Sequence, residues 1–173
     1  MLVGHSYGCS VISKVVEAIP DRVRRLVFWT GFVLNDGESM IETFPPAMQQ
    51  TLTRLAAESS DNSITLPFEI WRDVFINDGS DELARSTYRR LSPGTFGQLT
   101  ERLDLKKFHS LATPRSYILG TKDAVPPGDK GWQATMANRL GKHRLVELNA
   151  GHEALFTNPV ALVDAIIEAS RDD

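Results

Sequence analysis

Hydrophobic residues gather in short runs that alternate with amphipathic segments over much of the chain. Residues 1–3 form a brief apolar run that stops at Gly4, which indicates the end of a buried strand. Over residues 10–19, apolar side chains recur at helical spacing until Pro20. Residues 25–33 form a second apolar run, rich in Leu, Val, Phe and Trp. This order of strand, helix and strand predicts a parallel, right-handed unit.

The pattern changes in the middle of the chain, where turn signals separate short amphipathic pieces. These pieces predict helices over residues 46–58, 67–76, 80–91 and 94–103. Several helices between strands of one sheet would form a cap over the core. A plain helical insertion would show the same pattern.

A strand-helix alternation returns after Pro114. We expect strands over residues 115–119 and 144–148, with a helix over residues 128–140 between them. A last helix is expected to run to residue 170, because Asn158-Pro159 is typical of a helix start.

These segments predict one α/β domain with a mostly parallel sheet, since a chain of 173 residues is long enough for one buried core. Residues 1–33 form one half of the core, residues 34–105 a helical cap, and residues 106–173 the other half.

Composition narrows the class of protein. Hydrophobic residues make up 42% of the chain, and the net charge of −3 favours neither a nucleic-acid partner nor a membrane surface. The single cysteine, Cys9, excludes an intramolecular disulfide and a structural thiolate metal site. No apolar run approaches the roughly 20 residues that span a bilayer. We therefore expect a cytoplasmic protein that binds neither nucleic acid nor membrane.

The sequence Gly4-His5-Ser6-Tyr7-Gly8 matches the pattern G-x-S-x-G between a predicted strand and a predicted helix. In that context the pattern predicts a nucleophile elbow, a sharp turn that holds the serine hydroxyl above the sheet. A glycine-rich phosphate turn is the alternative, but the chain lacks the G-x-x-x-x-G-K-[ST] pattern that would support it.

The candidate acid is Asp123, which follows the predicted strand 115–119. The carboxyl ends of parallel strands meet at the edge where α/β sheets place their ligands. Asp36 follows an earlier strand and is the rival acid, but Asn35-Asp36-Gly37 is typical of a simple turn.

The candidate base is His152, in a loop directly after the last predicted strand. His109 and His143 stand beside lysines in segments typical of a surface. Ser6, Asp123 and His152 follow the order nucleophile, acid, base of a hydrolase triad, and all three are expected at one sheet edge.

The chain resembles the C-terminal two-thirds of α/β-hydrolases close to the plant methylesterase and hydroxynitrile lyase branch. Residues 2–8, 26–39 and 117–127, together with Gly151-His152, carry the resemblance. It implies an eight-stranded, mostly parallel sheet with a helical cap, and no metal or organic cofactor. It also implies an acyl-enzyme mechanism on a small, largely apolar carboxylic ester, with the Tyr7 N–H as an oxyanion donor. The expected substrate pocket consists of His5, Trp29, Phe32, Phe68, Trp71 and Phe75, although each aromatic alone is also typical of simple core packing.

The chain departs from the family pattern before the elbow, where the fold has four strands and here only residues 1–3 stand. The elbow strand is therefore expected to be an exposed edge through which the chain self-associates. One alternative is that the chain keeps the triad but has little or no activity alone, either as an interaction module or as the remnant of an enzyme. Another is a hydroxynitrile lyase, but Glu153 stands where those enzymes hold cyanide with a lysine.

Overall fold

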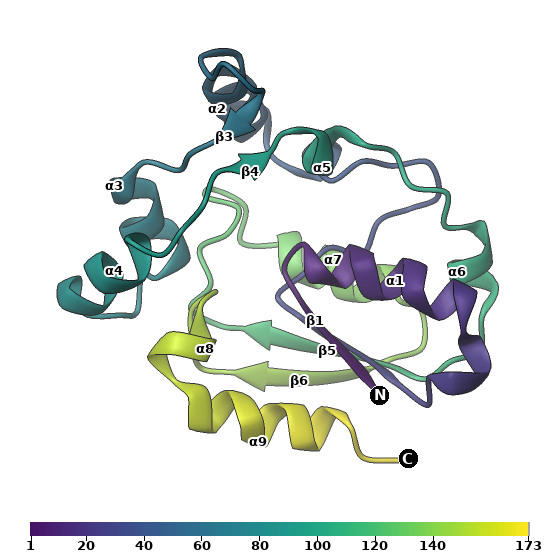
Figure 1. Ribbon diagram of the computed structural model, residues 1–173. Coiled ribbons are helices and arrows are strands. Elements are labelled where there is room, and N and C mark those ends of the chain that lie inside the picture. Colours follow the sequence, from purple (N-terminus) through teal and green to yellow (C-terminus); the bar gives the residue numbers. More distant parts are fainter. Residues whose placement is uncertain (173) are drawn as a thin grey trace.

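The computed structural model describes residues 1–172 and contains a parallel sheet of four strands in the order β1-β2-β5-β6. The strands comprise Leu2–His5 (β1), Leu26–Trp29 (β2), Arg115–Gly120 (β5) and Arg144–Leu148 (β6) (Figure 1). Each neighbouring pair is parallel, as the alternation of strands and helices predicts. The family likeness implies eight strands, of which the described residues supply four.

Both faces of β2 are buried, because its side chains alternate between two apolar clusters. Leu26 and Phe28 pack with α1 (Gly8–Ala18) and α7 (Trp132–Arg139) on one face. Val27 and Trp29 pack on the other face with α9 (Pro159–Ala169), which Figure 1 shows on the opposite side of the sheet. This burial explains why the strand sequence is apolar at every position rather than at alternate ones.

Helix α1 lies within two residues of its expected bounds, whereas α7 begins four residues later than expected and β2 covers only the first part of the expected run 25–33. The last strand has the expected bounds, and α9 begins at Pro159 as the Asn-Pro pair predicts. The short helices α6 (Lys106–Ser110) and α8 (Ala154–Thr157), and a 3₁₀ turn at Pro20–Arg22, were not expected, since they are too short to produce a periodic pattern.

The segment between β2 and α6 lies beyond the carboxyl ends of the strands (Figure 1). It contains α2 (Pro46–Ala57), α3 (Phe68–Ile70), α4 (Asp81–Tyr88) and α5 (Gly97–Thr100), with a 3₁₀ turn at Ile41–Thr43. A π-helical turn, Trp71–Phe75, continues α3. The expected helix over 94–103 is wrong at both ends, because Gly94–Thr95 (β4) pairs antiparallel with Ser63–Ile64 (β3) and α5 already ends at Thr100.

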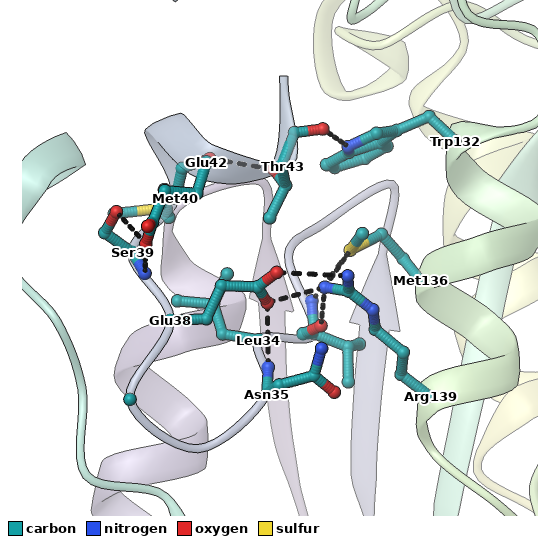
Figure 2. A network of polar contacts seen from close by, with 12 residues as sticks. Leu34, Asn35, Glu38, Ser39, Met40, Glu42, Thr43, Trp132, Met136 and Arg139 are labelled. Carbon is teal, nitrogen blue, oxygen red and sulfur yellow. Dashed lines mark hydrogen bonds and ion pairs between the residues drawn. The ribbon is translucent and has the colours of Figure 1, made fainter. Parts of the chain in front are cut away.

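A network of polar contacts fastens the start of this cap to α7 (Figure 2). The Arg139 guanidinium donates to both carboxylate oxygens of Glu38, at 2.7 and 3.1 Å. Both side chains are about four-fifths buried, with exposed fractions of 21% and 18%. The Trp132 indole N–H donates to the Thr43 carbonyl oxygen at 3.1 Å. The network thereby holds the first cap residues against the helix that precedes β6.

Strand β1 lies at the edge of the described sheet and pairs only with β2 there. Val3 of this strand and Val11 of α1 are exposed by 41% and 44%. Among the described residues, no helix is both long and apolar enough to cross a membrane.

Candidate active site

Ser6 occupies a tight turn between β1 and α1. Its backbone φ of 50° lies in the left-handed region, which residues other than glycine seldom adopt. The Ser6 N–H donates to the Trp29 carbonyl oxygen at 3.2 Å, so the neighbouring strand fixes the turn. Strain of this kind persists where the surrounding structure imposes it, and it is common at active sites.

The two glycines of the motif have different roles. A Cβ on Gly4 would lie 2.8 Å from the Gly8 carbonyl oxygen and 2.9 Å from the Cys9 nitrogen, both backbone atoms that cannot move aside. A Cβ on Gly8 would meet nothing within 4 Å. Steric crowding between β1 and α1 therefore requires the first glycine but not the second.

Tyr7 directly precedes α1, where the backbone N–H groups of a helix start are unpaired. No acceptor within residues 1–172 bonds the Tyr7 N–H. The partial positive charge at this helix end favours an anion close to the Ser6 hydroxyl.

Asp123 and His152 lie together after the ends of β5 and β6. Oδ2 of Asp123 is 2.9 Å from Nδ1 of His152, and the two side chains are exposed by only 0% and 1%. Asp123 Oδ1 also accepts from the Val125 N–H at 2.8 Å, which fixes the orientation of the carboxylate. The pair has the geometry by which a buried acid orients a histidine base.

The rival acid, Asp36, lies elsewhere. Its Oδ1 accepts from the Leu105 N–H at 2.9 Å, and this hydrogen bond holds the pKa of Asp36 below its usual value. Asp36 therefore connects the start of the cap to its end at Leu105, which is a structural role.

Ser6 follows β1 and therefore lies at the same edge of the parallel sheet, but no hydrogen bond between its hydroxyl and His152 occurs in residues 1–172. The structure thus brings the candidate base and the candidate acid into direct contact and leaves the candidate nucleophile without this hydrogen bond. Nucleophile–base contacts are often longer in the absence of a ligand.

His5 lies beside His152, an arrangement that its position in the motif did not predict. Nε2 of His5 is 3.0 Å from the His152 carbonyl oxygen, and the ring centroids are 4.7 Å apart. Burial, together with the neighbouring His152, lowers the pKa of His5 to about 3. The ring is therefore neutral near pH 7 and can donate its Nε2–H to the carbonyl.

A cavity of about 810 Å³ opens above Ser6, between the core and the cap. Ser6, Phe32, Trp71 and Phe75 line it, and the Phe75 ring also packs edge-on against His152, with centroids 5.5 Å apart. None of the described lining residues carries a formal charge. The cavity therefore suits an uncharged, largely apolar ligand.

Three residues expected in the pocket do not line this cavity. Trp29 points to the α9 face of the sheet and is buried there. Phe68 packs edge-on against Tyr88, with Arg85 over its ring at 4.7 Å. His5 is turned toward His152. Sequence position alone does not determine on which side of an element an aromatic side chain lies.

Among the described residues, one group of side chains could approach a metal ion. The ligand atoms of His5, His152 and Glu153 lie within 4.8 Å of one another. However, Asp123 already engages one ring nitrogen of His152, and the His152 carbonyl engages one of His5. Burial raises the pKa of the Glu153 carboxyl above its usual value. The neighbouring His152 opposes this rise, and the negative charge of Asp123 adds to it.

Comparison with known proteins agrees with this fold. A model of the Alpha/beta hydrolase family matches residues 1–165, and the chain belongs to this family. A similar solved structure is an extracellular alpha/beta-hydrolase from a Paenibacillus species, described as sharing structural and functional homology with tobacco salicylic acid binding protein 2. The two share 38% identity and a TM-score of 0.94, over 99% of this chain and 72% of that chain.

Two curated relatives are esterases by name. Putative methylesterase 11 of Arabidopsis thaliana, a chloroplastic protein, is 27% identical over 99% of this chain and 46% of its own length. A carbendazim hydrolyzing esterase from a Nocardioides species is 27% identical over 96% of this chain and 69% of its own length. The chain therefore spans about half of the first relative and about two thirds of the second.

Proposed function

We propose that this chain is a serine esterase in which Ser6 is the nucleophile, His152 the base and Asp123 the acid. The observation that carries the proposal is the buried hydrogen bond of 2.9 Å between Asp123 and His152, at the sheet edge where Ser6 occupies a strained turn. A buried acid–histidine pair beside a serine of this kind is the arrangement of acyl-transfer enzymes.

In the proposed mechanism, His152 removes the Ser6 proton as the serine oxygen attacks the ester carbonyl. Asp123 keeps His152 in the tautomer whose Nε2 accepts that proton, because its carboxylate binds the Nδ1–H. The Tyr7 N–H at the start of α1 stabilises the oxyanion. His152 then returns the proton to the leaving alcohol. Water next attacks the acyl-enzyme while His152 takes its proton, and His152 passes this proton to the Ser6 oxygen as the carboxylic acid leaves.

The proposed substrate is a small carboxylic ester that is largely apolar. The uncharged walls of the cavity support this, because they offer no counter-ion to a charged ligand. The volume of about 810 Å³ leaves room for acyl groups longer than acetate. The names of the curated relatives, methylesterase and carbendazim hydrolyzing esterase, also support an ester-like substrate.

Labelling with a fluorophosphonate probe tests the nucleophile. We expect wild-type protein to be labelled and Ser6→Ala to remain unlabelled. Ser10→Ala is the matched control, since Ser10 lies one helical turn further on, is buried, and should leave labelling unchanged. Folded wild-type protein that resists the probe would instead indicate an interaction module that retains the triad without activity.

Ester hydrolysis tests the acid. Asp123→Asn should lower kcat on the order of 10⁴-fold, because the amide favours the wrong tautomer of His152. Full turnover in this variant would contradict the assignment of Asp123.

A further inference from the structure

Two neighbouring cap residues, Asn77 and Asp78, contact both of the loops that carry the acid and the base. The Asn77 side-chain amide donates to the Lys122 carbonyl oxygen at 2.9 Å. Oδ2 of Asp78 accepts from the Gly151 N–H at 2.7 Å. Lys122 directly precedes Asp123, and Gly151 directly precedes His152.

The two loops also bond to each other, which closes the contacts into a ring. The Lys122 N–H donates to the Ala150 carbonyl oxygen at 3.1 Å. The ring therefore runs from Asn77 to Lys122, on to Ala150 and Gly151, and back to Asp78. We refer to these five residues as the Asn77–Asp78 clamp.

The clamp is closely packed around Gly151. A Cβ at this position would lie 2.6 Å from Oδ1 of Asn77 and 2.7 Å from Oδ1 of Asp78. The same Asp78 Oδ1 is buried and accepts no hydrogen bond. An unpaired buried oxygen destabilises a fold, so attachment of the cap alone does not account for this arrangement.

We propose that Asn77 and Asp78 are positioning residues that fix the backbone on which Asp123 and His152 stand. This inference rests on the proposed function for its kinetic consequence. The physical reason is that a hydrogen bond of 2.9 Å between two side chains tolerates little movement of the loops that carry them. The cap thereby sets the geometry of the site as well as covering it.

Four variants and a control test the proposal with 4-nitrophenyl butyrate as the substrate. Asp78→Ala, Asn77→Ala and Gly151→Ala each open the clamp and should lower kcat by up to roughly 10²-fold, with KM changed little. Asp78→Asn keeps an oxygen that can accept from Gly151 and should retain most of the activity. Asp81→Ala is the matched control: it removes an exposed carboxylate of the same cap segment, which pairs with Arg72 at 2.9 Å outside the clamp.

A second measurement does not depend on turnover. The Nδ1–H of His152, held by Asp123, should give a far-downfield proton NMR signal, assigned by its disappearance in His152→Ala. We expect Asp78→Ala and Asn77→Ala to shift or broaden this signal, and Asp78→Asn and Asp81→Ala to preserve it. If wild-type protein hydrolyses no ester, the proposed function fails while the NMR comparison still decides the role of the clamp.

A merely structural role would give a different pattern. The proposal is overturned if the clamp variants keep the wild-type kcat and NMR signal and show only a lower melting temperature or a higher KM. Asn77 is exposed at the surface, so Asn77→Ala decides the question even if Asp78→Ala fails to fold.

Discussion

The ring of His5 packs against that of His152, and its Nε2 lies 3.0 Å from the His152 carbonyl oxygen. One residue of the elbow thus contacts the backbone of the candidate base. Burial of the His5 ring beside a second imidazole favours its neutral form, and this effect outweighs the hydrogen bond to the carbonyl, which by itself favours the protonated form.

The pKa of His5 predicts an acid-sensitive stability. Since the pKa is about 3 in the folded protein and about 6.5 in the unfolded chain, the unfolded chain binds a proton between these values that the folded protein excludes. The contribution of His5 is therefore complete above pH 6.5 and is lost as the pH falls toward 3. The variant His5→Gln tests this dependence, because its amide keeps an Nε2–H donor but does not bind a proton in this pH range. Between about pH 7.5 and about pH 5, the unfolding free energy of wild type should fall by up to about 2 kcal/mol more than that of this variant. Urea unfolding measures the difference, and equal losses would contradict the low pKa.

The two motif glycines provide a steric test of the elbow. Gly4→Ala should reduce the free energy of unfolding by about 1–3 kcal/mol and disturb the Ser6 turn, because the new methyl group meets backbone atoms. Gly8→Ala should leave stability within about 0.5 kcal/mol of wild type or raise it, since alanine favours the helix. Thermal unfolding compares the two variants. Equal destabilisation would show that the motif is not constrained by contact between β1 and α1.

The uncharged cavity predicts selectivity between ester substrates. Each additional methylene group buried against its walls contributes about 0.8 kcal/mol, roughly fourfold in kcat/KM. 4-Nitrophenyl butyrate should therefore react faster than the acetate. The 4-nitrophenyl monoester of succinate has a similar length but carries a carboxylate, and it should react at least roughly tenfold more slowly than the butyrate. Comparable rates for the butyrate and the succinate monoester would contradict an uncharged binding site.

The exposed edge of β1 predicts self-association of the 173-residue chain. An unpaired strand edge beside apolar side chains is a template for pairing with another copy. Val3→Lys should shift the protein toward monomer in sedimentation velocity experiments. Val160→Lys is the control, because Val160 is 73% exposed on α9, away from this edge. A monomeric wild type, or an equal response of both variants, would contradict pairing through β1.

Much of the core could be predicted from the sequence because its signals are local. Strand β6 has the expected bounds, and the turn at Ser6 follows from the spacing of two glycines between a strand and a helix. The position of Asp123 and His152 at one edge follows from parallel topology, in which every strand ends on the same side. Their direct contact agrees with that expectation.

The cap was predicted less well, because its elements depend on partners distant in the sequence. Gly94–Thr95 becomes a strand only by pairing with Ser63–Ile64, and no local periodicity encodes a ladder of two residues. Trp29 and Phe32, three positions apart, both looked like pocket residues, yet only Phe32 lines the cavity.

The sequence by itself determined the composition of the candidate site: which serine, acid and histidine stand at strand ends, and in which order. The tertiary structure alone decided what surrounds them. His5 meets His152 across 147 positions, and Asn77 meets Lys122 across 45. The first contact depends on how the strands associate in the core, and the second depends on how the cap packs on the sheet. The packing of many side chains determines how these parts are placed. The backbone preferences that the local sequence encodes do not determine contacts between residues so distant in the chain.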